Sequence, residues 1–248
     1  FLAELRPATA LFLRFEGLQY DQDDSAGDKL QRYIGWVQAQ VDRYNGALIQ
    51  LTTGDKGSYL YAAFGAPIAH DDDALRAVAV AQTLRTSPAA FPFITTVQIG
   101  ISQGLMRVGA YGSTTRRTYG VLGEETITAA RLMSLAAPSQ VVISQAVADA
   151  IADHYQLLDL GLVKLKGKTE PQPIFAVSGP RPHADERLTR LYATPLVGRS
   201  TELATMMQTM ETVVAGQGHL LRIEGSAGVG KSHLVAHFVE QAKARAME

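Results

Sequence analysis

A glycine-rich octapeptide close to the C-terminal end limits the possible folds of this chain more than any other segment does. Residues 225–232 read GSAGVGKS and match the pattern G-x-x-x-x-G-K-[S/T], with 16 residues after Ser232. The apolar run His219–Glu224 in front of it predicts a strand, and apolar residues at helical spacing follow it. A strand, this loop and a helix in that order predict a loop that binds the phosphates of a nucleotide.

Each part of the motif has an expected role. The glycines let backbone N–H groups turn toward phosphate oxygens, the lysine reaches the terminal phosphates, and the hydroxyl holds Mg²⁺. The nucleotide-binding residues would be Gly225, Gly228, Gly230, Lys231 and Ser232, with Ser232 as the Mg²⁺ ligand. A chance turn before a helix is the alternative, which a match over eight positions with both flanks disfavours. Because phosphoryl transfer needs residues that 16 positions do not supply, we expect residues 196–248 to be the truncated α/β start of a P-loop ATPase domain.

Charge and composition narrow the classes of partner. The chain carries 23 Lys and Arg against 24 Asp and Glu, a formal net charge of −1, which offers no electrostatic attraction to nucleic acid. Cysteine is absent, which fits a reducing compartment, and no apolar run reaches the roughly 20 residues of a membrane helix. We therefore expect a cytoplasmic protein with no nucleic-acid partner and no membrane segment in this sequence. Because it opens at Phe1 and not at Met, we also expect further chain upstream.

The first 178 residues show the alternation of a mixed α and β domain. Helices are predicted over residues 30–41, 70–84 and 124–135, where apolar positions recur every three or four residues. Strands are predicted at Ala8–Glu16, Ala47–Thr53, Ser58–Phe64, Thr95–Ala110 and Thr118–Leu122, with smaller ones at Gln140–Ile143, Val163–Leu165 and Ile174–Val177. This βαββαβ order predicts an α+β, ferredoxin-like fold with extra C-terminal strands. Prolines and charged residues then predict a linker at residues 179–195.

Several segments of these 178 residues are similar to a known family. They are Phe64-Gly65 at the end of the predicted hairpin, VQIGISQGLMRVG at 97–109, YGVLGEETITAARLM at 119–133 and VKLKG at 163–167. Together they resemble the class III adenylyl and guanylyl cyclase catalytic domain over residues 1–178. The resemblance is closest to the second cyclase domain of soluble, bicarbonate-responsive adenylyl cyclases, where a linker and a P-loop domain of the AAA or STAND type follow in the same order.

The resemblance implies a reaction and the partners that it needs. Cyclases of this family convert ATP to cyclic AMP and pyrophosphate, with Mg²⁺ or Mn²⁺, in a site formed by two cyclase domains. We therefore expect a second cyclase domain as partner, either upstream in the same chain or in a dimer. The P-loop part would then be a regulatory domain that binds ATP.

One half of such a site holds two metal ions on two aspartates, which clamp the triphosphate. Position by position, the first aspartate falls at Arg14, and the second is kept as Asp55. Because a guanidinium repels metal ions, the resemblance implies that this domain is not the metal-binding half. Asp55 also fits a plain turn residue of the predicted hairpin.

The other half reads adenine, positions the ribose and neutralises charge on the α-phosphate. The adenine-reading lysine falls at Gln50 and its partner at Gly120, whereas the ribose-binding asparagine falls at Ile127. The arginine is kept as Arg131, the candidate catalytic residue, and Gln50 is a candidate nucleotide ligand. Outside the resemblance, Arg131 fits a helix residue that pairs with a surface carboxylate.

These substitutions leave two functions open. One is a half-site of an adenylyl cyclase pair, and the alternative is a catalytically dead pseudo-cyclase that serves as a dimerisation or regulatory module of a STAND-type signalling ATPase. A guanylyl cyclase is a third, weaker reading, because Gln50 and Gly120 select neither base. His70 with Asp71–Asp73 also suggests a metal site, but consecutive aspartates before a helix are typical of helix capping, which we expect here.

Overall fold

The computed structural model describes residues 3–54, 57–181, 198–225 and 230–245. The chain divides into two compact units, Phe1–Pro180 and Arg181–Glu248. The domain boundaries at residues 178 and 195 that the sequence suggests stay predictions.

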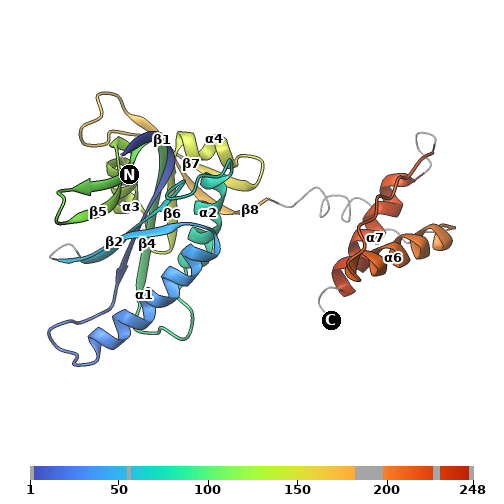
Figure 1. Ribbon diagram of the computed structural model, residues 1–248, viewed down its shortest axis with the longest axis horizontal. Coiled ribbons are helices and arrows are strands. Elements are labelled where there is room, and N and C mark those ends of the chain that lie inside the picture. The colour runs from blue at the N-terminus through green and yellow to red at the C-terminus, as the bar shows by residue number, and fades with distance from the viewer. Residues whose placement is uncertain (1–2, 55–56, 182–197, 226–229, 246–248) are drawn as a thin grey trace. The chain divides into compact units, whose positions relative to one another are not determined.

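A mixed sheet organises the first unit (Figure 1). Its strands are β1 (Glu4–Glu16), β2 (Ala47–Gly54), β3 (Gly57–Phe64), β4 (Thr96–Gly112), β5 (Arg117–Leu122), β6 (Gln140–Ser144), β7 (Tyr155–Val163) and β8 (Gln172–Pro180). Its helices are α1 (Ala26–Arg43), α2 (Asp73–Leu84), α3 (Glu124–Leu135) and α4 (Gln145–Ile151). The strand order is β2-β3-β1-β4-β6-β8-β7, and β5 pairs with β4 outside this path. The element order is that of the α+β, βαββαβ fold with extra C-terminal strands that the sequence predicts.

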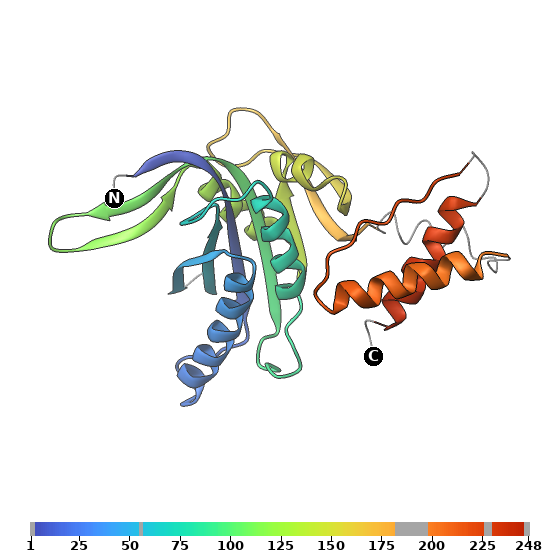
Figure 2. The ribbon, with the colours of Figure 1, turned by 45° about the vertical axis from the view of Figure 1, so that its right-hand side comes forward.

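Side chains of the central strand β1 alternate between the two faces of the sheet. Leu11, Leu13 and Phe15 belong to one core, to which α1, α2 and α4 contribute. Ala10 and Phe12 belong to a second core on the opposite face, where α3 packs. Figure 2 shows α1 and α2 on the same side of the sheet. The face that carries α3 is therefore the one on which Arg14, two positions after Phe12, also lies.

The end of this unit differs from expectation in two places. The predicted strand Val163–Leu165 is wrong, because β7 ends at Val163 and Leu165 is buried by packing with Leu132 and Ile174. β7 is an edge strand with mostly exposed side chains, so its sequence lacks the alternation that marks a half-buried strand. The helix α4 has only seven residues, too few for a helical period to stand out in the sequence.

The second unit contains α6 (Ser200–Val214) and α7 (Lys231–Arg245). The two helices are joined by an ion pair between Arg245 Nη1 and Glu211 Oε1 at 2.6 Å. The predicted strand His219–Glu224 is wrong in this structure, since these residues adopt no strand and Leu220 is 98% exposed. A strand needs a neighbour for its backbone hydrogen bonds, and the described residues of this unit provide none.

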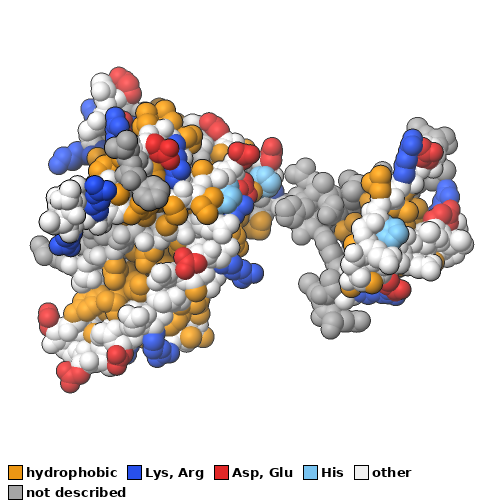
Figure 3. Space-filling model, viewed as in Figure 1, with side chains coloured by type: hydrophobic (Ala, Val, Ile, Leu, Met, Phe, Trp, Pro, Cys, Tyr) orange, Lys and Arg blue, Asp and Glu red, His pale blue; other side chains and the backbone are white. Residues whose placement is uncertain are grey.

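The surface shows no segregation of charge on the face seen in Figure 3. Acidic and basic side chains of the described residues are interspersed there, in line with the net charge of −1. Among the described residues, no helix combines the length and the apolar character needed to cross a membrane.

Two core tyrosines differ in what their hydroxyl groups meet. Tyr33 of α1 is fully buried against Phe15 and Phe91, and its hydroxyl has no hydrogen-bond partner among the described residues. Burial raises the pKa of Tyr33. Tyr61 of β3 is also buried, but its hydroxyl donates to the Val121 carbonyl at 2.9 Å. Burial raises the pKa of Tyr61 to about 12.

We predict opposite effects of the same substitution at these two positions. Tyr33→Phe removes an unpaired buried hydroxyl, so the free energy of unfolding is expected to stay constant or rise by up to about 1 kcal/mol. Tyr61→Phe breaks the 2.9 Å hydrogen bond to the Val121 carbonyl, which keeps only the longer one from Thr126 Oγ1 at 3.5 Å, so the free energy of unfolding is expected to fall by about 1 kcal/mol. Urea unfolding of the two variants measures both values, and the reverse ranking would contradict the prediction.

Candidate functional site

Arg14 lies near the end of β1, between Tyr59 of β3 and Gln98 of β4. Its Nη2 atom pairs with Glu16 Oε1 at 2.7 Å. The guanidinium lies against the β2–β3 hairpin, since a Cβ atom built at Gly57 would be 3.4 Å from Arg14 Nε. The Nε atom itself is buried without a hydrogen-bond partner among the described residues. A fixed positive charge therefore occupies the strand position where the resemblance places the first metal-binding aspartate.

Among the described residues, the arrangement around Arg14 does not fit a divalent metal ion. A cation at the hairpin would meet the guanidinium of Arg14 at short range, where like charges repel strongly. The described residues contain no group of three or more His, Cys, Asp or Glu side chains that could hold a metal. Asp55, the second candidate ligand, lies outside the described residues, as does the side chain of Ser232.

Arg131 lies on α3, on the same sheet face as Arg14. Its guanidinium lies next to Gly167, in the segment between β7 and β8. A Cβ atom added at Gly167 would be 3.4 Å from Arg131 Nη2. The carboxylate of Glu124, at the start of α3, has a lowered pKa, chiefly through a hydrogen bond from Lys168 and to a lesser degree through the charge of Arg131. The charge of Arg131 thus acts on a surface carboxylate, as the alternative interpretation also expects, and the catalytic role of Arg131 stays a prediction.

Ile127 precedes Arg131 by four residues on α3, so both lie on one side of the helix. The Ile127 side chain is 52% exposed. It offers no polar atom at the position where the resemblance expects the ribose-binding asparagine. The helix face therefore keeps the cationic group and lacks the amide.

The two candidate base-reading positions, Gln50 and Gly120, are linked through Tyr61. An irregularity in β2 between Leu48 and Gln50 brings Gln50 opposite Tyr61 of β3. The Tyr61 hydroxyl in turn reaches the Val121 carbonyl of β5, next to Gly120. The exposed Gln50 amide donates to Thr52 Oγ1 at 3.0 Å, so a ligand would have to compete with that bond.

A hollow of about 420 Å³ opens between β1, β3 and α3. It is lined by Phe12, Arg14, Tyr59, Ala130, Met133 and Ser134. The Phe12 ring stacks on Tyr61 with 4.7 Å between the ring centroids. An aromatic side chain and the guanidinium of Arg14 therefore line the same hollow. Of the candidate residues, Arg14 alone lines this hollow, whose other side chains are mostly apolar.

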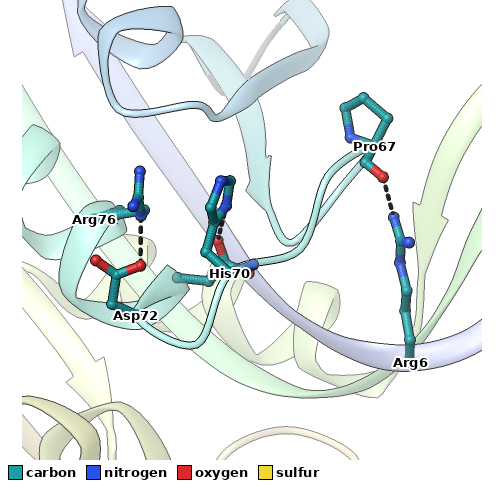
Figure 4. A network of polar contacts seen from close by, with 6 residues as sticks. Arg6, Pro67, His70, Asp72 and Arg76 are labelled. Carbon is teal, nitrogen blue, oxygen red and sulfur yellow. Dashed lines mark hydrogen bonds and ion pairs between the residues drawn. The ribbon is translucent and has the colours of Figure 1, made fainter.

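The residues before α2 form a polar network of their own (Figure 4). The backbone N–H of His70 donates to Asp73 Oδ2 at 2.9 Å, and the His70 ring lies 3.3 Å from Asp73 Oδ1. Arg76 Nε donates to Asp72 Oδ1 at 2.6 Å. The capping prediction is wrong for Asp72, because its carboxylate takes the Arg76 hydrogen bond and makes no side-chain hydrogen bond to the helix start.

The P-loop motif is described only at its two ends. Gly228 and the rest of residues 226–229 lie outside the described residues. At the near end of α7, Lys231 Nζ donates to the Gly225 carbonyl at 2.8 Å, and Gly230 has a φ angle of 87°, which favours glycine. The Lys231 side chain is therefore hydrogen-bonded to Gly225, the first residue of the motif.

Lys168 also belongs to the group of charges around Glu124 and is not among the site residues predicted from the sequence. Its ammonium pairs with Glu124 at 2.7 Å and lies 3.8 Å from Glu125, both at the start of α3. The signal in the sequence was the run Lys164–Lys168, which has three lysines in five residues and overlaps the strand predicted at Val163–Leu165. Only the fold brings this run to α3.

Comparisons with known proteins match a different family to each of the two parts of the chain. The family model of the adenylate and guanylate cyclase catalytic domain matches residues 30–178, and the model of an AAA ATPase domain matches residues 195–247. Adenylate cyclase type 10 of Rattus norvegicus is 26% identical over an alignment of 252 residues that covers 95% of this chain. The chain spans only 15% of the length of that relative.

Solved structures share the fold of the first unit. The adenylyl cyclase CyaB from P. aeruginosa superposes with a TM-score of 0.64 at 23% identity, over 73% of this chain and 98% of that one. The guanylyl cyclase Cya2 also has a TM-score of 0.64, at 25% identity, over 74% of this chain and 98% of that one. One neighbour is named an adenylyl cyclase and the other a guanylyl cyclase, so the fold does not distinguish the two activities.

We predict that this chain binds no Mn²⁺ at the β2–β3 hairpin, because Arg14 fills the position of a ligand with a like charge. Arg14→Asp replaces the guanidinium by a carboxylate and is expected to create saturable Mn²⁺ binding, which electron paramagnetic resonance of free Mn²⁺ measures. Arg14→Ala is the control, since it removes the cation without adding a ligand. Saturable binding to the unchanged chain that disappears in Asp55→Ala would contradict the prediction.

Proposed function

From the premise that the chain belongs to the adenylate and guanylate cyclase catalytic domain family, we propose that it is one half of an adenylyl cyclase pair. The pair would convert ATP to cyclic AMP and pyrophosphate in the cytoplasm. The partner is a second cyclase domain, in the same protein or in a dimer. The P-loop unit, with Lys231 and Ser232, would bind ATP and regulate the pair.

The position of Arg131 is the observation that carries this proposal. Its guanidinium lies on the α3 face, beside the turn at Gly167 and on the same side of the sheet as Gln50. Arg14 excludes metal ions from this domain's own hairpin, so Mg²⁺ or Mn²⁺ would have to be held with ATP by the partner domain. The two halves would then be unequal, with metal ligands on one and the arginine on the other.

The proposed chemistry is an internal transfer at the α-phosphate of ATP. The ribose 3′ oxygen bonds to the α-phosphorus as the bond to the pyrophosphate oxygen breaks, and negative charge grows on the α-phosphate oxygens. A fixed guanidinium aimed at those oxygens stabilises the transition state more than the ground state. Arg131 is the group of this chain for that role. Gln50 would offer its amide to adenine.

Ile127 limits the rate that such a half-site can reach. Loss of one preorganised hydrogen-bond donor costs on the order of 10²–10³ in turnover, and Ile127 has no donor to offer the ribose. We therefore propose a cyclase of reduced activity. The choice of ATP over GTP rests on the resemblance to adenylyl cyclases and on the name of the rat relative, because Gln50 and Gly120 select neither base.

The second candidate function is a pseudo-cyclase that regulates a STAND-type signalling ATPase. Two observations favour it, the ion pair of Arg14 with Glu16 at the metal position and the half-exposed Ile127. In that case Arg131 would pair only with carboxylates of its own domain. Nucleotide binding would be confined to the P-loop unit around Lys231.

Arg131→Ala in the full-length protein is the experiment that separates the two functions. If the domain completes a cyclase site, turnover is expected to fall by on the order of 10² or more. The KM for ATP should stay nearly unchanged, because the lost interaction strengthens only in the transition state. Cyclic AMP formation under steady-state conditions measures both. Turnover that stays within about twofold, roughly 0.4 kcal/mol, would contradict the role of Arg131.

Asp55→Ala is the paired variant, and we expect little change in turnover, because Arg14 has already disabled the metal position to which Asp55 would belong. Abolished turnover in Asp55→Ala with normal turnover in Arg131→Ala would reverse the assignment of halves. A full-length protein that makes no cyclic AMP in any of these forms would favour the pseudo-cyclase.

The 248-residue chain alone is expected to make no cyclic AMP from Mg-ATP or Mn-ATP. A homodimer would carry Arg14 at both metal positions and Ile127 at both ribose positions. Cyclic AMP formation above a buffer control that disappears in Arg131→Ala would overturn this expectation.

A further inference from the structure

A network of charged side chains joins the start of α3 to the segment between β7 and β8. Lys168 Nζ of that segment lies 2.7 Å from Glu124 Oε1 and 3.8 Å from Glu125 Oε1. The Lys168 and Glu125 side chains are 19% and 23% exposed, whereas that of Glu124 is 65% exposed, so water and salt screen the pair with Glu125 less than the pair with Glu124. The other oxygen of Glu125 accepts a hydrogen bond from Ser102 Oγ at 2.5 Å, and Ser102 is fully buried in β4. Glu125 therefore connects Lys168 to Ser102 of the sheet through an ion pair and a hydrogen bond.

The chain turns tightly just before Lys168. The backbone N–H of Lys168 donates to the Leu165 carbonyl at 3.0 Å, and Gly167 has a φ angle of 83°, which side-chain-bearing residues rarely adopt. Leu165 is 3% exposed and packs in a core cluster with Leu132 of α3. The turn is therefore held at one end by apolar packing and at the other by the charge of Lys168.

This turn borders the guanidinium of Arg131. A Cβ atom built at Gly167 would lie 3.4 Å from Arg131 Nη2 and 3.6 Å from Nη1, so the backbone of the turn limits where the guanidinium can go. Lys168 and Arg131 also act on the same carboxylate, Glu124, whose pKa both lower, the hydrogen bond from Lys168 being the largest cause. A movement of Lys168 would thus change both the space and the field around Arg131.

We propose that Lys168 is a positioning residue for Arg131. Its ion pairs with Glu124 and Glu125 hold the turn at Gly167 against the guanidinium, and the turn keeps that group in one orientation. The catalytic consequence rests on the proposed function, because Arg131 can act on a phosphate only in a complete cyclase site. Misplacement of a reacting group by about 1 Å can cost on the order of 10²-fold in rate, so loss of Lys168 should weaken the chemical step and spare ATP binding.

The kinetic test uses the full-length protein and three variants. Lys168→Met keeps the length of the side chain without its charge and is expected to lower turnover by about 10-fold to 100-fold at constant KM for ATP. Lys168→Arg keeps a cation within reach of both glutamates and should restore most of the turnover. Arg76→Met is the matched control, because it also removes a partly buried cation, from a 2.6 Å pair with Asp72, but on α2. It is expected to leave turnover unchanged.

Coupling between the two cations tests the mechanism itself. If Lys168 acts only through Arg131, Lys168→Met should add little to the loss already caused by Arg131→Ala, so the two effects are far from additive. Full additivity would mean that Lys168 acts independently, and would overturn the proposal. So would turnover of Lys168→Met within about twofold of the unchanged protein, a loss of only roughly 0.4 kcal/mol. Neither result would contradict the proposed role of Arg131, which Arg131→Ala tests separately.

Amide hydrogen exchange supplies a readout that does not depend on cyclase activity. In the same full-length variants, Lys168→Met should speed exchange at residues 164–168, whereas Lys168→Arg and Arg76→Met should not. This pattern in a protein that makes no cyclic AMP would support the positioning contact while the proposed function fails. Unchanged exchange at these residues in Lys168→Met would overturn the inference.

Discussion

The alternation of side chains along β1 is the constraint on which the candidate site depends. Leu11, Leu13 and Phe15 have to face the core formed with α1, α2 and α4, because a shift of one residue would expose all three. That requirement sends Phe12 and Arg14 to the α3 face. The guanidinium therefore lies beside the β2–β3 hairpin as a consequence of packing. With Glu16 as its partner, it fills the position that a metal ligand would need.

Each end of the α3 face lacks a different group that a cyclase site needs. We therefore prefer a pair of two different cyclase domains to a homodimer as the hypothesis. The hairpin end has a fixed cation and no described cluster of acidic ligands. The helix end keeps the cation of Arg131 but presents the apolar side chain of Ile127. Two copies would repeat both defects. A partner with carboxylates where this chain has Arg14 would supply the missing metal ligands, and only the amide absent at Ile127 would still be lacking.

Much of the fold could be predicted because most elements of the first unit bury one face, and a half-buried strand or helix shows its period in the sequence. The failures share a cause. The strand expected at His219–Glu224 has no neighbour among the described residues, Leu165 is buried by side chains of distant elements, and the Asp72 carboxylate is taken by Arg76 instead of the helix start. Each outcome was decided by a competing partner that a local pattern does not reveal.

By itself, the sequence determined the order of the main elements, the P-loop motif around Lys231, and the presence of Arg14, Ile127 and Arg131 at the positions that the resemblance assigns to the cyclase site. These follow from local periodicity and from motifs that are contiguous in the chain. Only the tertiary structure decided that the turn at Gly167 borders Arg131 and that Lys168 pairs with Glu124 and Glu125. Segments far apart in the sequence meet there because Leu165 and α3 share one apolar cluster, and no local pattern encodes that contact.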